Sequence, residues 1–99
     1  MKVLRTEDFA NWLIRLRDRQ GRAKILARID RLEGGNPGKT RNVGAGVVEM
    51  KIDYGPGYRV YYIQRGDVTV LLLLGGDKSS QNEDIPRAKK LAAQWKERE

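Results

Sequence analysis

Three polar side chains on two predicted strands have the types and spacing needed for chemistry on a phosphate. Glu49 and Lys51 stand two positions apart in the alternating segment Val47–Tyr54, and Arg59 lies near the start of the next strand-like segment. Because successive side chains of a strand point to opposite faces, Glu49 and Lys51 share one face, and pairing of the two segments brings Arg59 to it. We therefore expect a carboxylate, an ammonium group and a guanidinium group on one open sheet surface.

Such a trio can support cleavage of RNA without a metal ion or a histidine. The ribose 2′-hydroxyl is an internal nucleophile, so the protein must supply proton transfer and stabilise the charge that develops on the phosphate. The planar fork of Arg59 can bind two phosphoryl oxygens, and such contacts contribute roughly 2 to 4 kcal/mol to a transition state. Glu49 can act as the general base, or Lys51 in its neutral form. A cross-strand ion pair on a solvated face is the plain structural alternative.

Lys39 and Arg41 are candidates for additional phosphate contacts. Both lie in the segment from Gly34 to Gly46, which is rich in Gly, Asn and Pro and has no hydrophobic periodicity. Such a composition is typical of a loop. We expect a flexible basic loop that contacts RNA through these two side chains.

Two tyrosines and one further lysine complete the set of candidates. Tyr58 and Tyr61 follow the turn Gly55–Gly57, and an exposed tyrosine beside cations can stack on unpaired bases. Strands also favour tyrosine for packing, so both roles stay open for these two residues. Lys78 lies in the polar segment after an apolar strand, where loops often carry function, although the segment could equally be a turn that caps the last helix.

Composition limits the class of fold and of partner. The chain has 99 residues, which suits one modest core, so we predict a single domain over residues 1–99. Twenty Lys and Arg against thirteen Asp and Glu give a formal net charge of +7, and such a surface attracts nucleic acid or an acidic protein. A basic surface that serves solubility alone is the alternative.

Two residue types are absent from the sequence, and their absence excludes several classes of enzyme. The chain contains no His and no Cys, which excludes serine-triad hydrolases, cysteine proteases, HExxH metalloenzymes and zinc deaminases. We therefore predict no metal site and no cofactor. The first residues lack the apolar stretch of a signal peptide, and no run is long and apolar enough for a transmembrane helix. We expect a cytoplasmic protein without a membrane partner.

Hydrophobic periodicity predicts two successive helices near the start of the chain. Thr6 can cap the first helix, whose apolar residues recur at i, i+3, i+4 and i+7. These residues are Phe9, Trp12, Leu13 and Leu16. After a break at Gly21, a second apolar stripe ends at Gly34-Gly35 and is formed by Ile25, Ile29 and Leu32. We predict a helical hairpin, preceded by a short strand over residues 2–5.

Strand signals dominate the middle of the chain. Val47–Tyr54 alternates, Tyr58–Arg65 is aromatic and β-branched, and Val68–Leu74 is almost wholly apolar, so these segments predict an antiparallel meander. A last helix begins at Asn82 or Asp84 and tolerates Pro86 in its first turn. Its apolar stripe consists of Ile85, Ala88, Leu91, Ala92 and Trp95. The predicted order is β-α-α-β-β-β-α, an α+β fold with a mainly antiparallel four-stranded sheet.

The chain carries three motifs in succession: VEMKI at residues 48–52, GYRVYY at 57–62 and GGDKSSQ at 75–81, followed by Asp84-Ile85. In this order they resemble the RelE/ParE superfamily, and in particular its HigB-like addiction-module killer proteins. The resemblance covers nearly the whole chain and implies a RelE-like sheet. It also implies the toxin of a type II toxin–antitoxin system, an mRNA interferase that enters the ribosomal A site and cuts messenger RNA through its 2′-hydroxyl. The implied partners are the ribosome with its message and a cognate antitoxin of the helix-turn-helix type.

The resemblance also implies roles for single residues. Arg59 matches the arginine that contacts the scissile phosphate in RelE-like nucleases, and Lys51 matches one of their two strand lysines. Glu49 stands where RelE has the other lysine, and Lys78 lies approximately where RelE has another catalytic arginine. Ile85 lies near the place of a tyrosine in the last segment of RelE. We expect Arg59 to stabilise the phosphate with help from Lys78, while Lys51 and Glu49 share proton transfer.

Two other functions are compatible with the same fold. ParE-like relatives poison DNA gyrase by binding it and perform no hydrolysis, and a fold does not decide a function. An inactive nucleic-acid-binding descendant, acting as a regulator, is the third interpretation. The cationic residues and Arg59 favour the nuclease.

Overall fold

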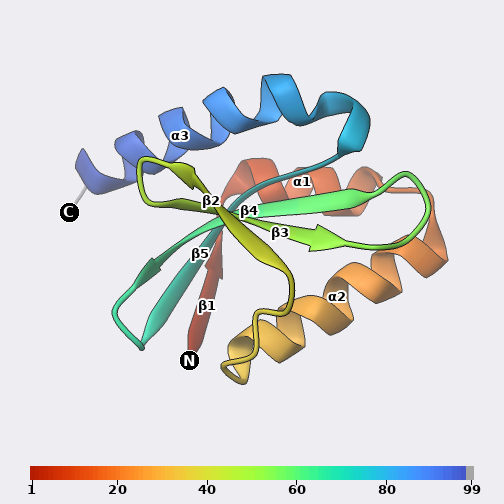
Figure 1. Cartoon of the computed structure of the whole chain (residues 1–99), viewed down its shortest axis with the longest axis horizontal. Coiled ribbons are helices and arrows are strands. Elements are labelled where there is room, and N and C mark those ends of the chain that lie inside the picture. Colours follow the sequence, from red (N-terminus) through yellow and green to blue (C-terminus); the bar gives the residue numbers. More distant parts are fainter. Residues whose placement is uncertain (98–99) are drawn as a thin grey trace.

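A computed structural model describes residues 1–97 as a five-stranded mixed sheet with helices on both faces (Figure 1). The elements are β1 (Lys2–Arg5), α1 (Glu7–Arg15), α2 (Arg19–Glu33), β2 (Thr40–Gly44), β3 (Val47–Ile52), β4 (Tyr58–Arg65), β5 (Thr69–Asp77), a 3-10 turn (Lys78–Ser80) and α3 (Gln81–Glu97). The strands lie in the order β1-β5-β4-β3-β2, with β1 parallel to β5 and all other neighbours antiparallel. The α+β class and the β3–β4–β5 meander are confirmed, whereas the four-stranded sheet and the order β-α-α-β-β-β-α are wrong by one strand.

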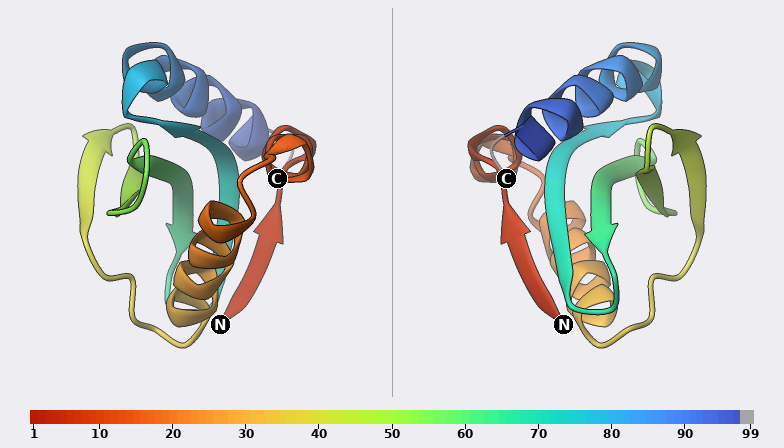
Figure 2. Two further views of the ribbon diagram at one scale, coloured as in Figure 1. Left: turned by 90° about the vertical axis from the view of Figure 1, so that its right-hand side faces the viewer. Right: turned by 90° about the vertical axis from the view of Figure 1, so that its left-hand side faces the viewer.

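The additional strand is β2, which lies within the segment predicted to be a loop. Four of its five residues are exposed, so the sequence of β2 has no alternation of buried and exposed positions. The strand forms through main-chain pairing with β3, in which Arg41 lies opposite Glu49, and a bulge interrupts the pairing between Asn42 and Gly44. Figure 2 shows β2 at one edge of the sheet and β1 at the other. An exposed edge strand of this kind gives no hydrophobic signal in the sequence.

Strand β5 is longer than predicted because it continues through Gly75 and Gly76 to Asp77. The glycines pair with β4, and Gly76 lies opposite Arg59. The Asp77 carboxylate then accepts a hydrogen bond from the Ser79 N–H and caps the 3-10 turn. The segment predicted to be a polar loop is therefore largely strand and helix.

The three helices begin at positions that were only partly predictable. Thr6 caps α1 as expected, since its hydroxyl accepts a hydrogen bond from the Phe9 N–H. Helix α2 begins at Arg19 with Asp18 as its N-cap, so the predicted break at Gly21 is wrong. Helix α3 begins at Gln81, one residue before the earlier of the two predicted starts, which places Pro86 beyond its first turn.

The sheet has a core on each face. Helices α1 and α2 cover one face, where they pack on side chains that include Met50, Val60 and Tyr62. Helix α3 covers the other face, where it packs on Val47 and Tyr61 among others. Figure 1 shows α2 and α3 on opposite sides of the sheet. Both helices contribute to the same core and therefore share a face. Helix α1 packs mainly on β5, whereas α2 packs on β3 and β4. The two helices therefore do not pack on each other as the predicted hairpin.

None of the helices in residues 1–97 is long and apolar enough to cross a membrane.

Candidate functional site

Strands β3 and β4 bring Glu49, Lys51 and Arg59 to the same face of the sheet. Lys51 lies directly opposite Arg59 in the antiparallel pairing, and Glu49 lies opposite Tyr61. The alternation of side chains puts all four residues on the face that α3 covers. The prediction that Glu49, Lys51 and Arg59 share one face of the sheet is therefore confirmed.

Glu49 and Arg59 are buried, so the expectation of an open surface is wrong at its centre. Each residue has only 5% of its surface exposed. Arg41 of β2 donates from Nε to Glu49 Oε1 at 3.2 Å, and Gln81 at the start of α3 donates from Nε2 to Glu49 Oε2 at 2.7 Å. The face is closed by β2 and by the first turn of α3, which the sequence pattern did not reveal.

The Arg59 guanidinium is only partly satisfied inside the chain. Its Nη1 donates to the main-chain oxygen of Gly57 at 2.8 Å, while its Nε lies 3.7 Å from Glu49 Oε1. That separation is too long for a hydrogen bond, and Arg59 Nε is a buried donor without a hydrogen-bond partner in residues 1–97. Burying a charge is costly unless it is paired and fully hydrogen-bonded. Stability alone therefore does not explain this arrangement.

Two adjoining clefts open beside this pair. The first, of about 450 Å³, extends toward β2 and the start of α3, and the second, of about 400 Å³, extends toward the turn at Gly55–Gly57. Lys51 and Arg59 line both clefts. The two side chains thus mark the boundary at which the clefts meet.

Cations outnumber carboxylates along the two clefts. The lining cations are Lys39, Arg41, Lys51, Arg59 and Lys78. The lining carboxylates are Glu49 and Asp53. Five positive charges against two negative charges leave +3, and a concave surface with such a charge concentrates polyanions near it.

Lys39 and Lys51 are exposed and share Asp53 as their counter-ion. Lys39 Nζ lies 3.1 Å from Asp53 Oδ2, and Lys51 Nζ lies 3.4 Å from Oδ1. The hydrogen bond and the charge of Lys39 hold the pKa of Asp53 below its usual value, and Lys51 adds a smaller effect. Exposed pairs of this kind contribute little to stability, so both ammonium groups can exchange Asp53 for a phosphate at low cost.

Lys78 stands at the second cleft, on the far side of Arg59 from β2. A Cβ on Gly57 would lie 3.2 Å from Arg59 Nη1 and 3.5 Å from the Cβ of Lys78, and Gly57 has a φ of 78°. Glycine at this turn therefore permits the close approach of both cations. Across residues 1–97, no carboxylate lies within ion-pair distance of the Lys78 ammonium group.

Tyr58 and Tyr61 are buried, so the expectation that either ring is exposed for base stacking is wrong. Tyr58 is 5% exposed on the opposite face, where its hydroxyl donates to Asp18 Oδ2 at 2.8 Å and its ring meets that of Trp12. Tyr61 is fully buried, and its hydroxyl has no hydrogen-bond partner in the part of the chain that the structure describes. Burial, and to a smaller extent the charge of Glu49, raises the pKa of Tyr61.

Gln81 is the member of this site that the sequence pattern did not single out. Its amide holds Glu49 Oε2 from the first position of α3. A single glutamine does not by itself indicate a functional site. The only feature of the sequence that pointed to Gln81 was its position in the GGDKSSQ motif. Arg41 was singled out, but for a mobile loop, whereas the structure fixes it on β2 against Glu49.

Metal-binding side chains are scarce around these clefts. No group of three or more His, Cys, Asp or Glu residues suited to a metal ion occurs within residues 1–97.

Comparison with known proteins identifies the class as addiction-module toxins. Residues 11–96 match the family described as "Phage derived protein Gp49-like (DUF891)", and the chain belongs to this family of toxin–antitoxin toxins. A protein of Haemophilus influenzae, described as "Uncharacterized protein", is 47% identical over 92 residues, which cover 93% of each chain. No solved structure matches the chain significantly. Family membership supports a toxin role and implies an antitoxin as partner.

Proposed function

We propose that this chain is a ribosome-dependent endoribonuclease that stops translation by cutting messenger RNA. The observation that carries the proposal is the buried, partly unsatisfied guanidinium of Arg59 at the boundary of two cationic clefts. Toxins of this family are generally of the nuclease type, which supports an activity on nucleic acid. The absence of His and Cys from the sequence favours a substrate that carries its own nucleophile.

RNA supplies that nucleophile. The 2′-hydroxyl attacks the adjacent phosphorus, the bond between phosphorus and O5′ breaks, and the products carry a 2′,3′-cyclic phosphate and a 5′-hydroxyl. The protein must accept the proton of the 2′-hydroxyl, stabilise the added negative charge on the phosphoryl oxygens and deliver a proton to O5′.

Arg59 is the group that stabilises the phosphoryl charge. A phosphate at the boundary of the clefts meets the outer nitrogens of its guanidinium, with Lys51 opposite on β3 and Lys78 on the other side. Charge-assisted contacts of this kind are about twice as strong as neutral hydrogen bonds. Lys51 and Lys78 add to the charge that balances the transition state.

Glu49 positions the neighbouring arginines, and Lys51 takes part in proton transfer. Both oxygens of Glu49 are held, one by Arg41 and the other by Gln81, so this carboxylate is suited to holding the arginines in place. The Lys51 side chain is 47% exposed at the boundary of the two clefts. Lys51 is therefore the group that exchanges protons with the substrate: in its neutral form it accepts the proton of the 2′-hydroxyl, and the resulting ammonium group delivers that proton to O5′.

The paired clefts suit a single strand with a nucleotide on each side of the cut. Lys39 and Arg41 in the first cleft contact phosphates on one side of the scissile bond. The second cleft receives the strand on the other side, beside Lys78. The cognate antitoxin, a small helix-turn-helix protein in this proposal, suppresses the toxin by covering these cations or by blocking entry into the A site.

Induction in growing cells, with mapping of both RNA ends and DNA breaks, tests the proposal. We expect cuts within translated messages that disappear when translation is blocked beforehand. Arg59→Ala should remove these cuts, while Arg19→Ala, an exposed arginine of α2, should keep them. Intact messages together with DNA breaks would contradict the proposal and favour gyrase poisoning.

A further inference from the structure

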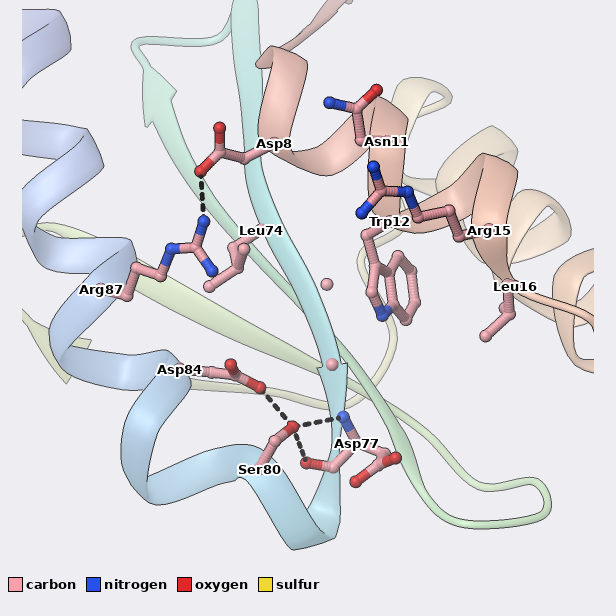
Figure 3. A pocket seen from close by; sticks show the side chains of 12 residues that line it. Asp8, Asn11, Trp12, Arg15, Leu16, Leu74, Asp77, Ser80, Asp84 and Arg87 are labelled. Atoms are coloured by element: carbon pink, nitrogen blue, oxygen red, sulfur yellow. Dashed lines mark hydrogen bonds and ion pairs between the residues drawn. The ribbon is translucent and has the colours of Figure 1, made fainter.

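A third cavity, of about 530 Å³, lies between α1, the end of β5 and the start of α3 (Figure 3). It is larger than either cationic cleft and shares no lining residue with them. None of the roles proposed above uses it. Its size lies within the range of pockets that hold small molecules or single nucleotides.

Two glycines of β5 create this space. A Cβ on Gly75 would overlap the ring of Trp12, and a Cβ on Gly76 would overlap the carboxylate of Asp84. The indole and the carboxylate therefore lie directly against the strand backbone, one on each side of β5, because neighbouring residues of a strand face opposite ways. Larger residues at either position would push these groups into the cavity and fill it.

The walls carry donors and acceptors around an aromatic ring. Figure 3 shows Asn11, Trp12 and Arg15 of α1 on one side and Asp84 of α3 on the other. Asp84 Oδ2 accepts a hydrogen bond from the Ser80 hydroxyl at 2.5 Å, which leaves Oδ1 for a ligand. Within residues 1–97, Arg15 makes no ion pair.

The charge of this cavity differs from that of the clefts. Its lining carboxylates are Asp8, Asp77 and Asp84, and its lining cations are Arg15 and Arg87, which leaves −1. Arg87 Nη2 donates to Asp8 Oδ2 at 2.9 Å and bridges α3 to α1 across one end. A phosphate is therefore disfavoured here, whereas an uncharged planar group with donors and acceptors is suited to the walls.

A nucleobase has these properties, and guanine matches them best. Guanine presents adjacent N1–H and N2–H₂ donors, and Asp84 Oδ1 can accept a hydrogen bond from this edge. Its O6 and N7 acceptors are the usual partners of an arginine such as Arg15. Stacking on an aromatic side chain such as Trp12 adds to the affinity for any base.

The cavity lies one strand away from the proposed cleavage site. Its floor residue Gly76 is the register partner of Arg59 on β4. Asp77 lines the cavity, and the next residue, Lys78, lines the second cleft. A single RNA strand that has one phosphate at Arg59 can therefore place a nearby base in the cavity.

We propose that this cavity is a base-binding subsite that prefers guanine and receives a nucleotide of the message close to the cut. The identity of the ligand as message RNA rests on the proposed nuclease function. The affinity for the base itself follows from Trp12, Arg15 and Asp84 and can be measured without any cleavage.

The test is a titration of the full chain with guanosine and with adenosine, neither of which carries a phosphate. The indole N–H signals of Trp12 and Trp95, the two tryptophans of the chain, report the outcome in an NMR spectrum. We expect guanosine to shift the Trp12 signal, to leave Trp95 unchanged and to bind at least about tenfold more tightly than adenosine. Asp84→Asn and Arg15→Gln should each weaken guanosine binding by about tenfold, whereas the exposed control Asp30→Asn should not.

Cleavage by Asp84→Asn provides the second measurement. We expect Asp84→Asn to lower cleavage near guanine by about tenfold, so that the guanine preference near the cut is lost, whereas the control Asp30→Asn should keep it. Equal responses to the two nucleosides, or no response to either, would overturn the subsite. A Trp12 signal that shifts on addition of the antitoxin but not of guanosine would also overturn it, because the cavity would then belong to a protein interface. Guanosine binding without any message cleavage would support the subsite and contradict the proposed nuclease.

Discussion

On the face of the sheet covered by α1 and α2, Tyr58 donates its buried hydroxyl to Asp18, and the same carboxylate accepts the Gly21 N–H at the start of α2. On the face covered by α3, the hydroxyl of Tyr61 and the Nε of Arg59 are buried donors without hydrogen-bond partners within residues 1–97. The two tyrosines lie only three positions apart on one strand. Alternation along β4 thus gives each face a different kind of polar environment.

The Tyr58 hydroxyl is a polar group that stabilises the fold through its hydrogen bond. The Tyr61 hydroxyl and Arg59 Nε are polar groups whose burial does not stabilise the fold. A buried hydroxyl that finds a partner stabilises a protein by about 1 kcal/mol, whereas an unpaired buried polar group costs free energy. Unpaired groups that persist beside a cleft are candidates for a functional role. Two of the four such side-chain atoms in residues 1–97 belong to Arg59 and Tyr61, on the face that holds the two cationic clefts. The other two are the Nε atoms of Arg22 and Arg28 on α2, and the outer nitrogens of both guanidinium groups donate to main-chain oxygens, which ties them into the fold.

Removal of the guanidinium should have the largest effect. We expect Arg59→Ala to lower message cleavage on programmed ribosomes by about 100- to 1000-fold, as is typical when a charge-stabilising donor is lost. Arg59→Lys should restore little, because an ammonium group cannot bind two phosphoryl oxygens in a fork. Both variants should still unfold cooperatively in a thermal melt. Full cleavage by Arg59→Ala would show that the α3 face holds no active site.

Gln81 tests whether Glu49 must be held in place. Gln81→Glu brings a second carboxylate to within hydrogen-bond distance of Glu49, and we expect cleavage to fall about tenfold because the repulsion displaces the partner of Arg59. Gln94→Glu, an exposed position on the same helix, is the matched control and should cleave normally. Rates measured over a range of message concentrations should show the loss mainly in kcat. Equal rates for the two variants would remove Gln81 from the site.

Deletion of a single hydroxyl from each face compares the two environments directly. Tyr58→Phe should lower the free energy of unfolding by about 1 kcal/mol through loss of the bond to Asp18. Tyr61→Phe should lower it by clearly less, because the Tyr61 hydroxyl approaches Glu49 without forming a well-aligned hydrogen bond. Urea denaturation of the two variants measures both values. A larger loss for Tyr61→Phe would contradict the distinction between the faces.

Tyr58 also makes the free energy of unfolding depend on pH in the alkaline range. Burial, the bond to Asp18 and the Asp18 charge raise the pKa of Tyr58 from 10.0 to about 12. The neutral hydroxyl is therefore favoured by folding, and its contribution is fully present below pH 10 and is lost as the pH rises through 12. Denaturation from pH 9 to 12 should show a shallower decline for Tyr58→Phe than for the parent chain. Identical slopes would mean that Tyr58 ionises normally in the folded state.

The sequence predicted the elements whose side chains alternate between core and surface. Strands β3 and β4 were placed correctly, and their pairing followed from the short turn between them, which is why the neighbours of Glu49 were foreseen. Strand β2 was missed because its side chains are mostly exposed, and the end of β5 was missed because Gly75 and Gly76 carry no side-chain pattern. The burial of Arg59 could not be predicted either, because it depends on β2 and on the end of β5.

The chemistry of the substrate provides the most direct test of the central claim that Arg59 assists attack by an RNA hydroxyl. A message is prepared with a single 2′-deoxyribose at the nucleotide before a mapped cut, and the purified chain is added to ribosomes that hold this message. We expect cleavage at that position to disappear, while the all-ribose message yields a 2′,3′-cyclic phosphate and a 5′-hydroxyl. Undiminished cleavage of the deoxy-substituted message would contradict the account, because the bond would then be broken by another nucleophile.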